Sequence, residues 1–439
     1  MSPELLGMIL LGTLIVTIFF GFPISFTLLF LAVVFGYIGF GARVFDLMVF
    51  QTLGLMKEET LAAVPLFIFM GYIVEQAGLM ERLFRAFRDI LAPLKGSLYL
   101  GVILTATVFA MATGIVGAAV TVLGIMAAPI MIKAGYSPRL SAGAIAAGGT
   151  LGILIPPSVM LVVMGPVLGV SVAKLYAAAF GPGFLLSALY IGYLLLRSYL
   201  NPALGPAVPL EERVGSAREI VREFLVGMVP LGGLIFATLG SILAGLATPS
   251  EAAATGATGA IMLALLYRKL DWTKLKQAAF NTLQTSSMIL FLAVASNIFG
   301  SVFARLGSAT MITNTLIALS LPPLAMILIV MGLIFLLGWP FEWPAIILIF
   351  LPIFLPLLLA LKIDLVWFGA LTAVNIQTAF LSPPVAMSAY YLKAVVPQWD
   401  LRTIYAGMME FMILQVIALL LVMFFPQIAL WFPNWLFGP

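Results

Sequence analysis

Residues 148–158 read GGTLGILIPPS, and residues 375–384 read NIQTAFLSPP. Each stretch places two adjacent prolines inside a long apolar segment. A proline removes a backbone donor and disfavours helix at the residue before it. We therefore expect a helix to open at each of these two places.

The composition places these segments in lipid. Of the 439 residues, 63% are hydrophobic and only 9% are charged. Such a chain has too little polar surface to cover a soluble globule of its size. A spanning helix needs about 20 apolar residues, and the apolar stretches repeat along the whole chain. The first of them, residues 5–20, has neither a basic region before it nor a small-residue cleavage site, so we predict a retained span rather than a signal peptide. The predicted fold class is an all-α polytopic membrane protein.

Missing residue types exclude several functions. The sequence has no cysteine and no histidine, which excludes disulfides, thiolate chemistry, histidine-ligated metals and a histidine proton relay. A membrane-embedded enzyme is further disfavoured because there is no HExxH motif and no pair of intramembrane acids at catalytic spacing. The net charge of +4 comes from basic residues at the ends of apolar segments, where membrane orientation explains them. No nucleic-acid partner is expected.

The chain repeats itself at low identity. A shift of 227 residues places Pro129 on Pro356 and residues 156–157 on residues 383–384. The same shift superposes two long apolar stretches, residues 98–135 and 322–361. We interpret the two halves as structural repeats.

These two long stretches exceed one crossing, and each has a central break. The breaks lie near residues 113–114 and within WPFEWP, residues 339–344. We predict that each stretch is a re-entrant hairpin. With the N-terminus outside, 16 of the 21 basic residues then lie inside, as the positive-inside rule requires. Each half has an odd number of crossings, so the prediction is two inverted repeats.

This topology divides the chain. Scaffold helices and an arm are predicted in 1–96 and 225–321. A hairpin, a broken helix and a following span are predicted in 97–198 and 322–439, which together form a transport domain. The segment 199–224 is predicted to be a solvated cytoplasmic linker. Residues 80–94 and 272–283 are predicted to be amphipathic helices at the membrane surface between spans.

Broken helices at corresponding positions of inverted halves are a sequence sign of a transporter's binding site. Freed carbonyl groups suit a small cation, and half-helix N-termini suit an anion. The alternative is a pair of kinks that only bend packing helices. The symmetric positions of the two breaks favour a binding site, and they disfavour a passive channel.

Five polar residues in apolar surroundings need separate interpretation. Glu342, in the second hairpin tip, is either a ligand or a solvated tip residue, and the sequence leaves both open. Glu251 is predicted to cap a helix. Asn297 either pairs with another helix, which is favoured, or lines the site. Glu75 and Glu410 receive no assignment.

Four strings in order resemble the large membrane subunit of tripartite ATP-independent periplasmic (TRAP) transporters, the DctM-like family. They are VPLFIFMG (64–71), GILIPPS (152–158), ATPSEAAA (247–254) and FLSPP (380–384). The resemblance covers essentially the whole chain. Each string is weak alone, and together they are highly specific.

The resemblance implies an elevator-type ion-transporter superfamily fold in the bacterial inner membrane, with a sodium-driven transport domain sliding against a scaffold. It also implies a small four-helix membrane subunit and a periplasmic binding protein that delivers the substrate. Family substrates are organic acids, including dicarboxylates, sialic acids and 2-oxo or 2-hydroxy acids. The alternative is a stand-alone carboxylate/sodium symporter that needs no binding protein.

The sequence departs from the family pattern in the first hairpin tip. Many members have a Ser-Gly-Ser tip, whereas Thr113-Gly114-Ile115 keeps one hydroxyl. After the second proline pair, residues 385–393 (VAMSAYYLK) resemble the branch linked to 2-oxo acids, lactate and aromatic or polyol compounds.

Each hairpin tip and its neighbouring break are predicted to hold one sodium ion, mainly through carbonyl groups. The first site is predicted at Thr113, Gly114, Gly149, Thr150, Gly152 and Pro156. The second is predicted at Gly338, Glu342, Thr378, Leu381 and Ser382. Substrate contacts are predicted at Thr113, Ser158, Asn297, Asn375 and Ser382. No cofactor besides sodium is expected, and the absence of histidine favours sodium over protons as the coupling ion.

Overall fold

The computed structural model describes residues 2–208, 216–383 and 385–438. Every regular element among them is helical. The first half contains α1 (Pro3–Phe19), α2 (Ile24–Phe40), α3 (Arg43–Met56), η1 (Glu59–Ala62), α4 (Ala63–Gln76), α5 (Leu79–Leu91), α6 (Ser97–Thr113), α7 (Val116–Lys133), α8 (Pro138–Leu154), α9 (Val159–Leu168), α10 (Val172–Leu200) and η2 (Pro202–Leu204). The second half contains α11 (Ala217–Ile235), η4 (Phe236–Gly240), α12 (Ser241–Leu243), α13 (Pro249–Leu266), α14 (Trp272–Arg305), α15 (Ser308–Ala318), α16 (Pro323–Leu337), α17 (Trp343–Ala345), η5 (Ile346–Phe350), α18 (Leu351–Ala360), α19 (Leu365–Ala379), α20 (Met387–Val395), α21 (Leu401–Phe424) and α22 (Gln427–Phe437).

Helix length and composition agree with a membrane protein. In the described part of the chain, seven helices are long and apolar enough to cross a membrane, and the bent pair α8 and α9 would make an eighth span. Several shorter helices, among them α1, α2 and α6, are also apolar. The predicted class, an all-α polytopic membrane protein, is confirmed.

All four predicted helix breaks are present. The first long apolar stretch breaks between Thr113 and Val116, and the second breaks between Leu337 and Trp343. At the first proline pair, α8 ends at Leu154 and the axis of α9 is turned by 45°. At the second pair, α19 ends at Ala379 and α20 begins at Met387. Pro384 of this second pair lies outside the described residues.

The order of helices repeats at the spacing that the prolines predicted. Helix α7 begins at Val116 and α17 at Trp343, which is 227 positions later. Helices α8 and α19, which begin at Pro138 and Leu365, are separated by the same 227 positions. Each half therefore contains one interrupted helix pair, one broken helix and one long helix in the same order.

The prediction of a separate surface helix over residues 272–283 is wrong. These residues are the first third of α14, a single helix of 34 residues. No glycine or proline occurs between Trp272 and Phe299, so nothing in the local sequence ends the helix. At 1.5 Å per residue, α14 is about 51 Å long. By contrast, residues 79–91 do form the separate amphipathic helix α5, which follows Gly78 in a left-handed conformation.

The sequence predicted that the linker is solvated, but the start of the linker is partly buried. Gly205 is buried, and its carbonyl accepts a hydrogen bond from the backbone N–H of Gly96 at 2.8 Å. The Tyr99 hydroxyl donates to the carbonyl of Leu204 at 2.6 Å. The start of the linker is thus fixed to the beginning of α6, because its polar backbone finds partners there.

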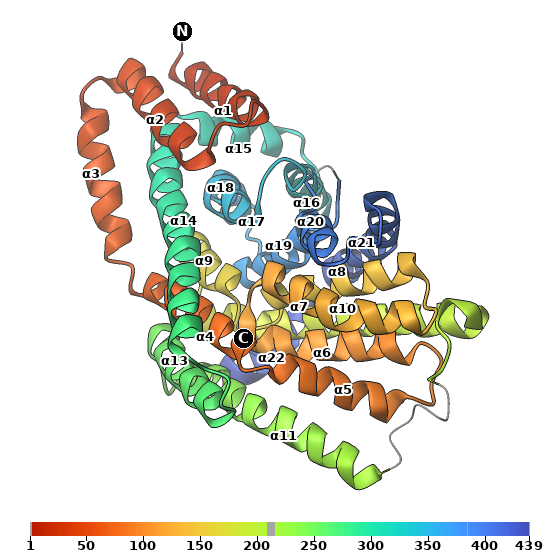
Figure 1. The fold of residues 1–439 in the computed structure, drawn as a ribbon. Coiled ribbons are helices and arrows are strands. Elements are labelled where there is room, and N and C mark those ends of the chain that lie inside the picture. Colours follow the sequence, from red (N-terminus) through yellow and green to blue (C-terminus); the bar gives the residue numbers. More distant parts are fainter. Residues whose placement is uncertain (1, 209–215, 384, 439) are drawn as a thin grey trace.

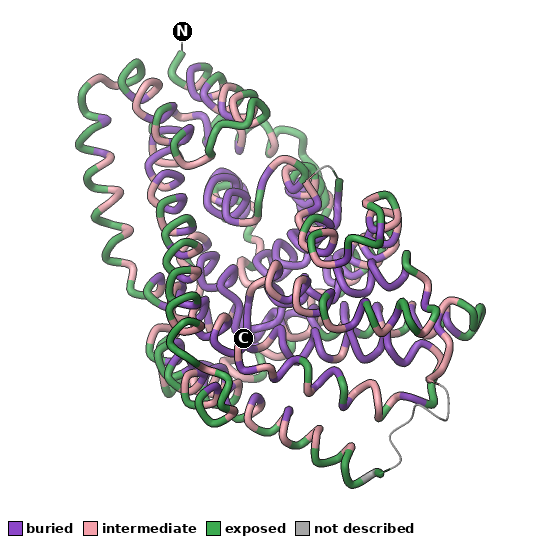
Figure 2. Tube along the Cα trace, in the orientation of Figure 1, coloured by how far each residue is buried: buried purple, intermediate pink, exposed green. Residues whose placement is uncertain are grey.

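Two groups of helices are visible in Figure 1. Helix α14 extends along one side of the molecule, with α2, α3 and α4 packed on it, and α13 packs on α4. Helices α6, α7 and α21 instead pack around α8. Figure 2 shows that the buried residues concentrate in this second group, whereas α3 and α11 are largely exposed.

Small residues allow α8 to occupy the centre. Every residue from Leu140 to Leu154 is buried. A β-carbon at Gly143 would lie 2.6 Å from the Phe411 ring of α21, and one at Gly149 would lie 2.3 Å from the Val120 side chain of α7. Glycine at these positions lets neighbouring helices approach closely, as is common in membrane proteins.

Candidate functional site

The first hairpin tip packs directly on the first proline break. Gly114 has φ +62° and a β-carbon there would lie 3.5 Å from the carbonyl oxygen of Pro157. A β-carbon at Gly152 would lie 3.7 Å from the backbone nitrogen of Ile115. The tip, with its left-handed Gly114, therefore lies close to the proline break and to the last turn of α8.

Hydroxyl groups cap both sides of this contact. Ser158 begins α9, where its oxygen accepts from the backbone N–H of Leu161 and its hydroxyl donates to the carbonyl of Ile153. The hydroxyl of Thr113 donates to the carbonyl of Phe109 at 3.2 Å. That of Thr150 donates to Ala147 at 2.8 Å. The Ser158 hydroxyl therefore satisfies a carbonyl at the first proline break, whereas Thr113 and Thr150 bond to carbonyls within their own helices.

The structure brings most of the first predicted sodium site together. Thr113 and Gly114 belong to the tip, while Gly152 and Pro156 belong to the break against which the tip packs. Gly149 lies one turn earlier in α8 and contacts α7 through Val120. The site itself stays a prediction.

The second tip and the second break also meet. A β-carbon at Gly338 would lie 3.0 Å from the β-carbon of Ala379. The side-chain amide of Asn375 donates to the carbonyl of Met331 at 2.7 Å, which ties α19 to α16. Thr378 donates to the carbonyl of Asn375 at 2.7 Å, and Ser382 donates to that of Thr378 at 2.8 Å. The side-chain oxygen of Asn375 is buried and accepts no hydrogen bond from the residues that the structure describes.

The second predicted sodium site is divided. Gly338, Thr378, Leu381 and Ser382 lie buried around the break. The side chain of Glu342 instead lines a cavity to which none of those four contributes. Sodium binding by the four buried residues stays a prediction. Glu342 lies apart from them, because its side chain faces the cavity.

This cavity of about 460 Å³ lies between the two hairpin tips. The tips contribute Gly114 and Ile115 from the first hairpin and Phe341, Glu342 and Trp343 from the second. The broken helices add the residues that flank each break, which are Ile153, Val159, Ala379, Phe380, Val385 and Met387. Both interrupted helices and both broken helices therefore converge on one space.

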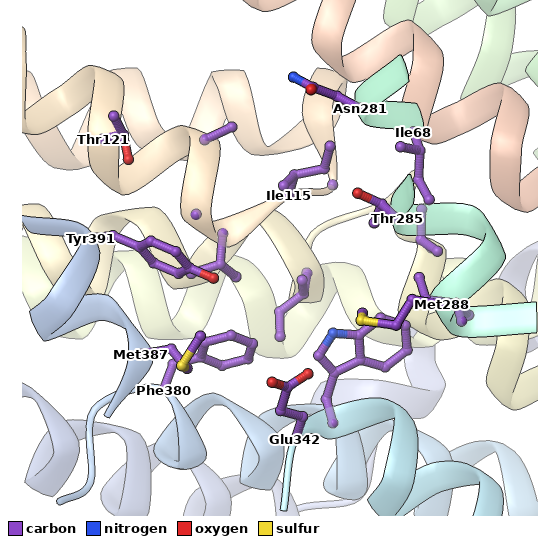
Figure 3. A pocket seen from close by; sticks show the side chains of 18 of the residues that line it. Ile68, Ile115, Thr121, Asn281, Thr285, Met288, Glu342, Phe380, Met387 and Tyr391 are labelled. Carbon is purple, nitrogen blue, oxygen red and sulfur yellow. The ribbon is translucent and has the colours of Figure 1, made fainter. Parts of the chain in front are cut away.

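Helices α4 and α14 form the opposite wall. Tyr72 and Glu75 come from α4, and Asn281, Thr285 and Met288 come from α14. The hydroxyls of Tyr72 and Thr285 are hydrogen-bonded at 3.2 Å, which joins the two helices beside the cavity. In Figure 3, Glu342 directs its carboxylate into the space between Phe380 and Met288, with Tyr391 on the far side.

Sequence reasoning missed most residues of this wall. Tyr72, Asn281, Thr285 and Met288 lie on continuous helices without any local break. No sequence signal separates them from ordinary packing residues, since only the approach of α4 and α14 to the tips gives them a role. Glu75, an acid in an apolar helix, was the one visible signal.

None of the five predicted substrate ligands lines this cavity. Thr113, Ser158, Asn375 and Ser382 are buried beside the breaks, where they hydrogen-bond to backbone carbonyls. Asn297 lines a different cavity of about 480 Å³, and its amide donates to the carbonyl of Gln51 at 3.2 Å. The favoured interpretation of Asn297, helix pairing, is confirmed. Substrate binding by any of the five stays a prediction.

Two further acids have structural partners. Thr248 and Glu251 form a capping box at the start of α13, with the Glu251 carboxylate accepting from the Thr248 N–H at 2.8 Å. The predicted cap is confirmed. Glu410 on α21 pairs with Arg139 at 2.5 Å and with Arg197 at 3.0 Å. It therefore links α21 to the start of α8 and to α10.

Comparison with known proteins gives one consistent picture. Residues 11–428 match the family model described as "Tripartite ATP-independent periplasmic transporter, DctM component". The C4-dicarboxylate TRAP transporter large permease protein DctM of Pseudomonas aeruginosa is 31% identical over 87% of each chain. The sialic acid TRAP transporter large permease protein SiaM of Vibrio cholerae is 28% identical over 96% of this chain and 97% of that one. The fold is similar to that of the Alcanivorax borkumensis YdaH transporter, with a TM-score of 0.66 at 16% identity over the full length of both chains.

Proposed function

Because this chain belongs to the DctM family of TRAP transporter large permeases, we propose that it moves an organic acid into the cell by sodium-coupled secondary transport. Members of this family are multi-pass proteins of the bacterial inner membrane, and they are transport permeases rather than enzymes. The cavity between the hairpin tips is the proposed substrate site. Its position at two helix breaks is the observation that carries the proposal.

The start of α7 suits the carboxylate of such a substrate. Val116, Gly117 and Ala118 line the cavity, and no side chain caps this helix end. The N–H groups of a first turn have no partner within the helix and carry the positive end of its dipole. A carboxylate placed there gains these hydrogen bonds without any basic side chain.

We infer that the cavity opens toward the cytoplasmic side. Its outer wall consists of the end of α4 next to α5 and the first half of α14. Helix α5 carries Arg82, Arg85 and Arg88, and the positive-inside rule places such a helix in the cytoplasm. The proposed conformation is therefore inward-facing.

An elevator mechanism accounts for the two groups of helices. Residues 97–198 and 322–439 would form the moving transport domain, and residues 1–96 and 225–321 the scaffold, with 199–224 as the linker. In this proposal the halves are inverted repeats, and the interrupted pairs α6 with α7 and α16 with α17 are re-entrant hairpins. The repeated order of helices and the fold likeness to the YdaH transporter support it.

Sodium is proposed at the two tip and break contacts. The first ion would lie among Thr113, Gly114, Gly149, Thr150, Gly152 and Pro156. The second would lie among Gly338, Thr378, Leu381 and Ser382, with Glu342 as an additional ligand if its side chain turns toward the break. Freed carbonyls at membrane depth are the support for both sites.

The proposed partners follow from the family. A tripartite system implies a periplasmic binding protein and a small membrane subunit besides this chain. The alternative, a stand-alone symporter, would transport without either partner.

Uptake into proteoliposomes tests the proposal. The chain would be reconstituted with its small subunit, and radiolabelled organic acids would be offered with the cognate binding protein and an inward sodium gradient. We expect uptake only when the small subunit, the binding protein and the sodium gradient are all present. Uptake that needs no binding protein would favour the symporter, and absence of uptake for every acid in every gradient would contradict the function itself.

A further inference from the structure

The charge of the cavity between the hairpin tips is unusual for a site that accepts an acid. Among the described residues that line it, the only charged side chains are the carboxylates of Glu75 and Glu342, and no lysine or arginine is present. A substrate with two or more carboxylates would therefore meet like charges and find no basic side chain. Charged ligands are normally matched by opposite charge in their sites.

Glu342 is available for a ligand. Its side chain is exposed to the cavity, and it has no hydrogen-bond or ion-pair partner within the described part of the chain. It lies at the second hairpin tip, as the residue directly before α17. In the proposed elevator the substrate travels with this tip, so Glu342 stays beside it throughout the movement.

Aromatic side chains surround this carboxylate. Phe341, Trp343, Phe380 and Tyr391 all line the cavity with it. Figure 3 shows Phe380 and the Tyr391 hydroxyl on the side toward which the Glu342 carboxylate points. Aromatic faces attract a cation, and combining them with a carboxylate is the usual way to bind an ammonium group.

We propose that the substrate is a zwitterion, an organic acid that also carries an ammonium or quaternary ammonium group, with this group held by Glu342 among the aromatic rings. This inference rests on the proposed function and specifies its substrate class. The carboxylate end would lie at the first turn of α7, across the cavity from Glu342. The cavity of about 460 Å³ is large enough for both ends of a small amino acid or betaine.

Matched ligands test this class directly. The purified full-length chain would be titrated in sodium-containing detergent buffer with amino acids and betaines, with the 2-hydroxy and 2-oxo acids of the same skeletons, and with succinate. Binding would be followed by the ligand-induced shift of the thermal unfolding temperature. We expect at least one zwitterion to bind tenfold or more tightly than its hydroxy-acid and oxo-acid counterparts.

A substitution separates recognition by Glu342 from general charge effects. Glu342→Gln preserves shape and should weaken binding of that zwitterion at least tenfold, while changing binding of its hydroxy-acid counterpart less than threefold. Asp46→Asn is the matched control, because Asp46 is an exposed acid on α3 outside the cavity. It should change neither affinity, and unfolding temperatures without ligand verify that both variants fold.

Several results would overturn the inference. One is a panel in which no zwitterion binds, or in which hydroxy acids, oxo acids or succinate bind as tightly as the zwitterions. Another is a Glu342→Gln variant that loses affinity for all ligands equally while its half-saturating sodium concentration rises, since this would assign Glu342 to the ion. Each of these leaves the proposed function intact if liposome uptake of any organic acid still occurs.

Discussion

Gly71 on α4 lies against the tip of the first hairpin, and its substitution tests the proposed elevator. A β-carbon at Gly71 would lie 2.4 Å from the carbonyl oxygen of Thr113 and 3.0 Å from its α-carbon. Both are backbone atoms, so no side-chain rotation can relieve the clash. In the proposal α4 belongs to the scaffold and Thr113 to the moving domain, so Gly71→Ala penalises only conformations in which the two are in contact.

The size of the effect follows from the geometry. Inserting one methyl group into a tightly packed contact costs about 1–3 kcal/mol. A cost of about 2 kcal/mol shifts the equilibrium between the proposed inward-facing conformation and the outward-facing one by about 30-fold, since each 1.4 kcal/mol is a factor of about ten. Alanine also raises helix stability relative to glycine. A control with the same backbone effect is therefore needed.

Gly300→Ala supplies that control, because Gly300 lies within α14 and a β-carbon there meets no atom within 4 Å. The chain has no cysteine, so Thr121→Cys introduces a single reporter in the cavity wall. Labelling by a membrane-impermeant maleimide from the cytoplasmic side should slow about tenfold or more with Gly71→Ala and stay unchanged with Gly300→Ala.

Two results would refute this reasoning. Equal labelling rates together with equal unfolding temperatures in both variants would mean that the contact between Gly71 and Thr113 does not constrain the cavity. A lower unfolding temperature for Gly71→Ala without any change in labelling would mean that α4 and the tip never separate. In that case the clash destabilises the fold alone, and the boundary between scaffold and moving domain lies elsewhere.

Three further predictions concern ions and stability. Uptake should follow a sodium gradient and should not be driven by a pH gradient in sodium-free buffer, where proton-driven uptake would contradict sodium coupling. Pro157→Ala should reduce transport more than Thr113→Ala, because a restored helix withdraws several carbonyls whereas the threonine change removes one oxygen. The half-saturating sodium concentration in uptake assays measures both effects. Unchanged values in both variants would place the ions elsewhere. Glu410→Ala should destabilise the fold by about 1–2 kcal/mol, since Arg139 and Arg197 lose a shared partner but remain partly solvated. Thermal unfolding measures this loss, and an unchanged unfolding temperature would show that the ion pairs contribute nothing to stability.

The sequence by itself determined where the helices break. Proline and glycine act through local backbone chemistry, so the opening after Leu154 and the tip at Gly114 could be predicted without any tertiary contact. The equal spacing of the proline pairs also predicted the repeated order of helices. The capping box at Glu251 is equally local, because both of its partners lie within four residues.

Only the tertiary structure decided which side chains face the cavity. Tyr72 and Thr285 are 213 positions apart and meet because α4 packs on α14. Periodicity could not predict this, since in an apolar helix within a membrane protein both the lipid face and the packed face are hydrophobic. Helix packing also decided that Asn297 lines a different cavity, whereas Asn375 is buried beside the second break. Glu342 was visible as an acid within an apolar stretch, but its position among aromatic rings from two helix breaks depends on how the halves of the chain pack together.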